Sequence, residues 1–216
     1  MNIGIIFDLD GTLLDTLEDL RDSVNYALAQ FGCPARTLEE VRTFVGNGAE
    51  RLIALSLPGK ENDPPVAEVL AVYQKYYKAH SRIKTKPYDG IPEQLAKISG
   101  KFPMAIVSNK PDAPVKLLCA DYFPGVYALG ETADCPRKPA PDMVYKAMGV
   151  LGVEKCIYVG DSEVDVATAR NAGVPCLSVL WGFRDRECLE NAGGQHFCQE
   201  TSQLAAMLER IAEGVL

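Results

Sequence analysis

The sequence contains two histidines and one tryptophan, and it has no apolar run long enough to cross a membrane. The densest apolar stretch, from Val174 to Phe183, carries a proline and falls short of the roughly 18–20 residues of a membrane helix. His80 and His196 lie far apart, and neither has a partnered Cys or Ser pattern around it. We therefore predict no membrane span and interpret both histidines as structural or surface residues.

Cysteine pairs with the spacing of zinc or redox sites are also absent. The seven cysteines are odd in number, and no two of them form C-x-x-C. Free cysteines inside apolar stretches behave as small hydrophobic residues, which fits a reducing compartment. The first residues lack the basic region and the small-residue cleavage site of a signal peptide. These features favour a cytoplasmic protein.

The chain is acidic and has no cluster of basic residues. It contains 22 Lys and Arg against 29 Asp and Glu, which gives a net charge of −7. Neither nucleic acid nor an anionic membrane is therefore an expected partner. The 216 residues are 47% hydrophobic, which suits one globular domain, or one domain with a smaller insertion. We expect a monomer or a weak homodimer.

Short apolar runs alternate with segments of helical period through most of the chain. The expected strands are Ile3–Phe7, Met104–Val107, Val126–Leu129, Cys156–Val159 and Pro175–Leu180. The expected helices are Ile91–Ser99, Ala113–Ala120, Pro141–Leu151, Val164–Ala172 and Thr201–Ala212. Such alternation is typical of βαβ units. We predict an α/β fold, a Rossmann-like parallel sheet with helices on both faces and the first strand near its centre.

Residues 15–83 interrupt this alternation. The segment shows helical period in Leu17–Phe31, Leu38–Phe44, Ala49–Leu57 and Pro65–His80, and it contains no convincing strand. We interpret it as an all-helical domain inserted after the first strand. The core domain would then comprise residues 1–14 and 84–216.

Two aspartates follow the first expected strand, in the run Asp8-Leu-Asp10-Gly-Thr12. In an open parallel sheet, ligands bind beyond the carboxyl ends of the strands, and Gly11 lets the backbone turn tightly there. Two carboxylates at one place repel each other, so an ionised pair favours a divalent cation beside them. The alternative is that these polar residues only mark the point where a strand passes into a solvent-exposed loop.

Other polar residues follow the later strands. The run Ser108-Asn109-Lys110 offers an anion a hydroxyl, an amide and the start of the next helix. Asp161 follows another strand, and Asp165 lies one helical turn further on. Lys138 stands in a proline-flanked loop. Taken singly, Ser108-Asn109 is typical of a helix cap and Lys138 of a solvated lysine, but together these residues predict one polar site.

The order and spacing of these motifs resemble the haloacid-dehalogenase-like superfamily of phosphotransferases over essentially the whole chain. The matching residues are Asp8-Leu-Asp-Gly-Thr-Leu-Leu-Asp15, Ser108-Asn109, Lys138-Pro-Ala-Pro141 and Gly160-Asp161-Ser-Glu-Val-Asp165. The helical insertion is similar to the alpha-helical (C1-type) cap of that superfamily. Two further segments are most similar to its phosphoglycolate phosphatase group, namely Thr43-Phe-Val-Gly-Asn-Gly-Ala-Glu-Arg51 and Asn171-Ala-Gly173.

The resemblance implies a Mg²⁺-dependent phosphatase that acts on a small phosphorylated metabolite. Asp8 would attack phosphorus and form an aspartyl-phosphate. Asp10 would protonate the leaving oxygen and then take a proton from the attacking water. Thr12 would hydrogen-bond near Asp10.

The resemblance also implies a set of metal ligands. Mg²⁺ would be held by the Asp8 carboxylate, the Asp10 backbone carbonyl and Asp161. Asp165 would either bind the ion itself or act through a group that does.

Three further residues would bind the phosphoryl group by the same resemblance. Ser108 and the amide of Asn109 would hold the transferring oxygens, and Lys138 would supply fixed positive charge.

The run from Gly46 to Arg51 lies in the helical insertion and lacks the third glycine of a dinucleotide-binding motif. Two interpretations stay open. The run is a turn between helices, or it is a cap loop with a hinge that closes on the substrate. In the second case Gly48 and Arg51 would bind substrate, with Arg51 or Lys110 near its anionic end.

Alternative functions use similar residues. A phosphosugar mutase or a pyrophosphatase of the same superfamily would need the same acids. A phospho-aspartate signalling receiver shares the fold class, but its acceptor aspartate follows the third strand and it carries no helical insertion. The intact acids disfavour a binding protein that has lost catalysis. We expect Trp181-Gly-Phe183, which follows a strand end, to pack in the core or to border the site.

Overall fold

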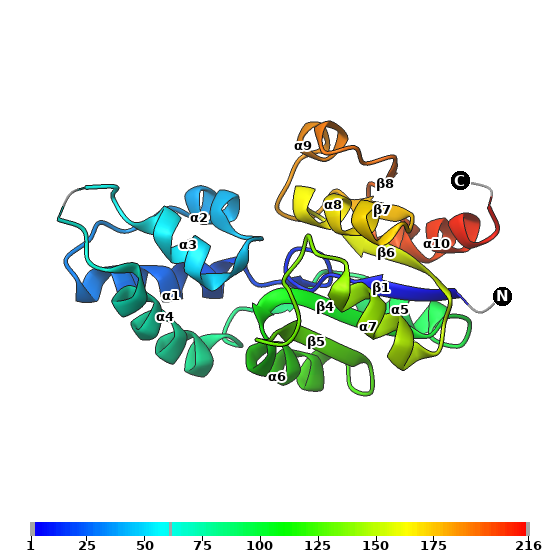
Figure 1. The fold of residues 1–216 in the computed structure, drawn as a ribbon, viewed down its shortest axis with the longest axis horizontal. Coiled ribbons are helices and arrows are strands. Elements are labelled where there is room, and N and C mark those ends of the chain that lie inside the picture. The colour runs from blue at the N-terminus through cyan, green and yellow to red at the C-terminus, as the bar shows by residue number, and fades with distance from the viewer. Residues whose placement is uncertain (1–2, 61, 215–216) are drawn as a thin grey trace. The chain divides into compact units, whose positions relative to one another are not determined.

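The computed structural model describes residues 3–60 and 62–214. These residues form two compact units, one made of the chain up to Leu14 and from Pro87 onward, the other of Asp15–Lys86. We call them the core unit and the helical unit (Figure 1). Residues 84–86, which we expected in the core domain, group with the helical unit.

Six parallel strands form the sheet of the core unit, in the order β5-β4-β1-β6-β7-β8. Their bounds are β1 Ile3–Phe7, β4 Met104–Pro111, β5 Tyr127–Glu131, β6 Lys155–Gly160, β7 Cys176–Val179 and β8 His196–Cys198. β1 pairs with β4 on one side and with β6 on the other. The predicted parallel sheet with the first strand near its centre is confirmed.

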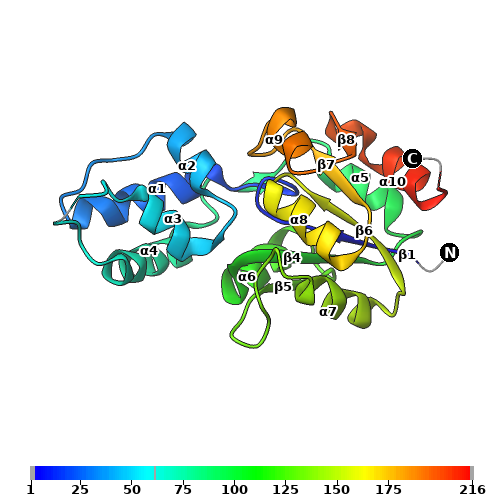
Figure 2. The same cartoon turned by 45° about the horizontal axis from the view of Figure 1, so that its top comes forward.

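Helices cover both faces of this sheet (Figures 1 and 2). They are α5 Ile91–Ile98, α6 Asp112–Tyr122, α7 Asp142–Leu151, α8 Glu163–Ala172, α9 Arg186–Asn191 and α10 Leu204–Ala212. In β1, Ile5 and Phe7 pack in the hydrophobic cluster of α5, α6 and α10, whereas Ile6 packs with α7 and α8. Every residue of β1 is buried, as expected for a central strand covered on both faces.

Glycine ends two helices of the core unit, α7 and α8. Gly152 after α7 and Gly173 after α8 have φ values of 65° and 71°. This left-handed conformation is open to glycine without a side-chain clash, so the chain can leave each helix in a tight turn. Both helices therefore return the chain to the next strand where the sequence predicts.

Three features of the core differ from the expectation. α9 and β8 were not predicted, because six and three residues are too few to show a period. The closing helix begins with a 3₁₀ turn, η1 Thr201–Gln203. β4 runs on to Pro111, so Ser108–Lys110 lie inside a strand and not at the start of a helix as we expected.

The helical unit contains α1 Leu17–Gln30, α2 Leu38–Phe44, α3 Gly48–Ser56 and α4 Val66–His80. α1 and α4 pack against each other. Tyr73 and Tyr77 of α4 are buried and stack with their ring centres 5.5 Å apart. Tyr76 stacks between Tyr26 and His80, at 3.8 and 3.7 Å. The aromatic side chains of α4 therefore serve helix packing, and His80 takes part in it.

A buried carboxylate fastens the end of the helical unit to its beginning. Asp19 of α1 accepts hydrogen bonds from three successive backbone N–H groups, those of Ile83, Lys84 and Thr85, at 3.1, 3.1 and 2.9 Å. Just beyond them, β3 Lys86–Pro87 pairs with β2 Leu14–Asp15 as a two-stranded sheet. The returning chain is thus held where it leaves the helical unit.

None of the helices in the described part of the chain is long and apolar enough to cross a membrane.

Replacing Asp19 by alanine is expected to destabilise the helical unit by about 2–4 kcal/mol, because three N–H groups lose a charged acceptor. The measurement is urea unfolding followed by circular dichroism. Asp22→Ala is the matched control, since Asp22 lies one turn away and pairs with Lys84 at the surface. Its loss should cost less than about 1 kcal/mol. Equal effects of the two substitutions would contradict the anchoring role.

Candidate active site

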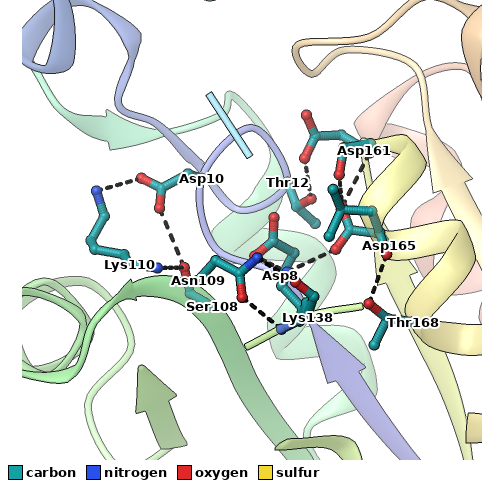
Figure 3. A network of polar contacts seen from close by, with 12 residues as sticks. Asp8, Asp10, Thr12, Ser108, Asn109, Lys110, Lys138, Asp161, Asp165 and Thr168 are labelled. Carbon is teal, nitrogen blue, oxygen red and sulfur yellow. Dashed lines mark hydrogen bonds and ion pairs between the residues drawn. The ribbon is translucent and has the colours of Figure 1, made fainter. Parts of the chain in front are cut away.

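The carboxyl ends of neighbouring strands bring the candidate site residues together (Figure 3). Asp8 and Asp10 follow β1, Ser108, Asn109 and Lys110 end β4, Lys138 lies between β5 and α7, and Asp161 follows β6. The backbone N–H of Asp8 donates to Val159 of β6 at 2.8 Å, so the first aspartate stays in line with the sheet. The strand-end residues that the sequence singled out thus converge in the core unit.

Lys138 lies at the centre of this cluster. Its Nζ is 2.8 Å from Asp8 Oδ1 and 2.8 Å from Asp165 Oδ1, and it donates a hydrogen bond to the Tyr158 hydroxyl at 3.1 Å. The Lys138 side chain is only 3% exposed. Sequence reasoning left a solvated lysine as the alternative, and the structure excludes it because the ammonium group is buried between two carboxylates.

Asn109 fixes the backbone of the loop that carries Lys138. Its side-chain Nδ2 donates to the Lys138 carbonyl at 2.9 Å, and its Oδ1 accepts from the Lys138 N–H at 2.8 Å. The peptide bond between Lys138 and Pro139 is cis. Because its amide nitrogen and oxygen each make a hydrogen bond to this loop, Asn109 positions Lys138.

Asp165 is held by donors on both carboxylate oxygens. Oδ1 accepts from Lys138 and from the Tyr158 hydroxyl, the latter at 3.0 Å. Oδ2 accepts from the backbone N–H and the hydroxyl of Ser162, at 3.1 and 2.6 Å. Tyr158 was missed from the sequence, because it lies in an apolar strand and its ring is typical of a core residue. The only feature of the sequence that pointed to a polar role was the tyrosine hydroxyl within the apolar run Cys156–Val159.

Asp161 is oriented by two different loops. The Thr12 hydroxyl donates to Asp161 Oδ1 at 2.9 Å, and the Phe183 N–H donates to Oδ2 at 2.8 Å. Thr12 was expected to hydrogen-bond near Asp10, but the structure turns its hydroxyl to Asp161 instead, because residues 9–14 form a tight turn that faces β6.

Asp10 forms a second ion pair at the edge of the cluster. Lys110 Nζ lies 2.9 Å from Asp10 Oδ1, and both side chains are largely buried. The Ser108 hydroxyl lies 3.5 Å from Asp10 Oδ2 and accepts a hydrogen bond from the Lys110 N–H at 3.1 Å. The two aspartates after β1 therefore have different lysine partners.

Residues 5–179 match the model of the family described as haloacid dehalogenase-like hydrolase. The match includes both aspartates after β1 as well as Lys138, Asp161 and Asp165. The chain belongs to this family. The helical unit falls entirely within the matched residues.

Known proteins of this family cover nearly the same length. The chain is 36% identical to a phosphoglycolate phosphatase of Thiobacillus denitrificans, over 83% of this chain and 84% of that protein. It is 32% identical to a phosphoglycolate phosphatase of Mesorhizobium japonicum, over 96% and 97%. A crystal structure from Lactobacillus delbrueckii subsp. bulgaricus, provisionally assigned as a phosphoglycolate phosphatase, has a TM-score of 0.87 at 36% identity, over 96% and 98%.

Burial raises the pKa of two acids of this haloacid dehalogenase-like site, Asp8 and Asp161. It raises the pKa of Asp8 well above its usual range, against the pull of Lys138 and with further repulsion from Asp165 and Asp161. Burial together with the charge of Asp165 raises the pKa of Asp161 to about 7. Burial works to lower the pKa of Lys138, but the carboxylates of Asp165 and Asp8 outweigh it and raise that pKa. One ammonium group thus faces three acids, and the cluster favours additional positive charge.

The donor set fits a hard divalent cation. Carboxylate oxygens of Asp8, Asp161 and Asp165 lie within 4.8 Å of one another, and all three residues are buried. Oxygen ligands that converge in this way are those that Mg²⁺ and Ca²⁺ prefer. The residues present therefore fit the ion that the family resemblance implies.

Two of the expected substrate-binding residues belong to the helical unit. Gly48 begins α3 with a φ of 82°, and Arg51 is exposed on the first turns of that helix. Gly46, with a φ of 124°, supports the turn between α2 and α3. The role of Gly48 and Arg51 toward substrate stays a prediction.

Mg²⁺ is expected to stabilise the protein much more at about pH 8 than at about pH 5, as measured by its shift of the thermal midpoint. The raised pKa of Asp161, about 7, means that the ion-free fold binds a proton there. That proton contributes stability that is fully present below pH ~4 and lost as the pH rises through ~7. Mg²⁺ must displace it at low pH and meets a free carboxylate at high pH. Asp161→Asn should weaken the pH dependence of the shift without removing it, because the pKa of Asp8 is also raised. An equal shift at both pH values in the wild-type protein would contradict this assignment.

Proposed function

We propose that this chain is a Mg²⁺-dependent phosphatase that hydrolyses a small phosphate monoester of the phosphoglycolate type. The observation that carries the proposal is the contact of Lys138 with Asp8 inside a cluster of buried acids. Membership of the haloacid dehalogenase-like family and the phosphoglycolate phosphatases at 32–36% identity support it.

Asp8 is the nucleophile in this proposal. One of its carboxylate oxygens attacks phosphorus, the bond from phosphorus to the ester oxygen breaks, and an aspartyl-phosphate forms. The Nζ atom of Lys138 lies 2.8 Å from Asp8 Oδ1. Its positive charge there favours the ionised nucleophile and offsets the negative charge of the transferring oxygens. Water then attacks the aspartyl-phosphate, which releases inorganic phosphate and restores Asp8.

Asp10 moves the protons of both steps. It gives a proton to the leaving alkoxide in the first step and takes one from the attacking water in the second, so the residue ends as it began. Its hydrogen-bonding neighbours at the end of β4 keep the carboxyl group apart from the metal-binding acids. The hydroxyl of Ser108 and the backbone N–H of Asn109 bind the transferring oxygens in this proposal.

When bound, Mg²⁺ would offset the negative charge that Asp8 and the phosphoryl oxygens bring together. Asp8 and Asp161 would hold it through their carboxylates, together with the Asp10 backbone carbonyl. Asp165 is assigned to orient Lys138, because each of its oxygens already accepts two hydrogen bonds. Each oxygen of Asp161 accepts one hydrogen bond from the described part of the protein, which leaves a lone pair on each for the ion.

Lys110 suits a substrate that carries an acid close to its phosphate. Its ammonium is 2.9 Å from Asp10 Oδ1, and Asp10 must reach the leaving oxygen by a hydrogen bond. The ammonium therefore lies within about 6 Å of that oxygen if Oδ1 makes the bond, and within about 8 Å if Oδ2 makes it. In phosphoglycolate a single methylene separates the ester oxygen from the carboxylate. The same cation can therefore bind the carboxylate while Asp10 acts. Gly48 and Arg51 of the helical unit remain proposed substrate-binding residues on the basis of the family resemblance.

Phosphate release from a panel of monoesters tests the proposed function. The panel contains phosphoglycolate, sugar phosphates, a nucleotide, pyrophosphate and an aryl phosphate, each with Mg²⁺ or with EDTA. We expect release that needs Mg²⁺, is fastest with phosphoglycolate and falls by at least about 10³-fold in Asp8→Asn. Asp22→Asn, a surface change, serves as the control. Activity that survives in Asp8→Asn would contradict the proposal, and release from no substrate would overturn it.

Lys110→Met should alter the substrate preference. Loss of a charged hydrogen bond of about 1.5–3 kcal/mol predicts a fall of about 10- to 100-fold in kcat/KM for phosphoglycolate. The aryl phosphate, which has no carboxylate, should lose less, so the ratio of the two kcat/KM values should drop. Lys116→Met is the matched control, because Lys116 is exposed and pairs with Asp112 on α6. The same loss for both substrates would show that Lys110 does not recognise the carboxylate.

A further inference from the structure

The loop after β7 contacts the site at two points. The Phe183 N–H donates to Asp161 Oδ2 at 2.8 Å. The indole Nε1–H of Trp181 donates to the backbone carbonyl of Thr12 at 3.0 Å. Thr12 in turn donates its hydroxyl to Asp161 Oδ1, a contact drawn in Figure 3. Trp181 and Phe183 therefore reach both oxygens of one carboxylate, one directly and one through Thr12.

Glycines on both sides let this loop and the turn after β1 close on Asp161. A Cβ atom on Gly182 would lie 2.3 Å from Asp161 Cβ and 2.5 Å from the carbonyl oxygen of Gly11. A Cβ atom on Gly11 would lie 2.3 Å from Asp161 Oδ2. Two backbone segments thus approach the carboxylate more closely than any other residue type would allow. Asp161 has little room to change its side-chain angle.

We propose that Trp181 is a positioning residue for the metal site: through Thr12 it holds Asp161 in the orientation that binds Mg²⁺. The inference rests on the proposed function in one respect, namely that Asp161 is a ligand of the ion. It goes beyond that function because it assigns a role to the chain's only tryptophan.

The physical reason is the geometry of the carboxylate. Each oxygen of Asp161 accepts one hydrogen bond from the protein, which fixes the plane of the carboxylate and leaves one acceptor direction on each oxygen. Thr12 can fix Oδ1 only while its own backbone stays in place, and the Trp181 N–H bonds that backbone from the side of β7. Groups that orient a metal ligand in this way typically change metal affinity by 10–100-fold when they are removed.

Trp181→Phe removes the N–H and keeps an aromatic ring against the core. Calorimetric titration with Mg²⁺, in the absence of substrate, is expected to show a dissociation constant about 3- to 10-fold above the wild-type value, since Trp181 acts one residue further out than Thr12. Thr12→Val should show a larger increase, about 10- to 100-fold, and Thr12→Ser should restore most of the affinity. Tyr145→Phe, a change on the exposed face of α7, is the control for the loss of an aromatic polar group.

Activity gives a second reading of the same variants. If Trp181 positions Asp161, the Mg²⁺ concentration for half-maximal activity should rise by the same factor as the dissociation constant, and excess Mg²⁺ should restore the turnover number. Unchanged Mg²⁺ affinity in Trp181→Phe would overturn the inference. So would a loss of turnover that excess Mg²⁺ fails to restore, because that result indicates a structural defect. A wild-type protein that binds no Mg²⁺ would instead refute the metal site of the proposed function.

Discussion

A buried ammonium group between two carboxylates is the interaction on which the site depends. Lys138 contacts Asp8 and Asp165 at 2.8 Å each, with almost no exposure to water. Removing one member of such a cluster leaves a charge buried without its partner, which typically costs about 3–5 kcal/mol. The surrounding hydrogen bonds follow from this constraint. Asn109 fixes the backbone of Lys138, and Ser162 fixes the far side of Asp165.

The parallel sheet supplies the framework for this arrangement. β1 lies between β4 and β6, so residues that are far apart in sequence end at one edge of the sheet. Asp8 thereby lies beside Asp161 from β6, and Asp10 meets Lys110 from β4. The two aspartates form separate ion pairs, Asp8 with Lys138 and Asp10 with Lys110. Asp8 belongs to the cluster that favours a cation, and Asp10 keeps a lysine of its own.

The strands and the acids at their ends could be predicted from the sequence for a simple physical reason. Buried parallel strands are short apolar runs, and Asp8 and Asp161 interrupt two of them directly at the end. The role of Lys138 was harder to predict, because no local pattern distinguishes a buried lysine from a solvated one. Its place in the prediction came from its position among the other motifs.

Residues that act through another residue could not be predicted. Tyr158 and Trp181 have the aromatic rings that a core needs, and only their contacts in three dimensions reveal a polar role. The hydroxyl of Thr12 was assigned to the wrong neighbourhood, because the turn that carries it faces β6 and Asp161. Sequence patterns record which groups approach a strand end, whereas hydrogen-bond partners across the sheet depend on register and loop shape.

In the proposed reaction Asp8 carries the phosphoryl group during turnover, so a covalent phosphoryl group can be sought on that residue. The protein is mixed with phosphoglycolate and Mg²⁺, quenched in acid within the first turnovers and digested, and the modified residue is located by mass spectrometry. We expect a phosphoryl group on Asp8, which disappears once the substrate is exhausted. A phosphoryl group on another residue, or steady turnover without any on Asp8, would contradict it.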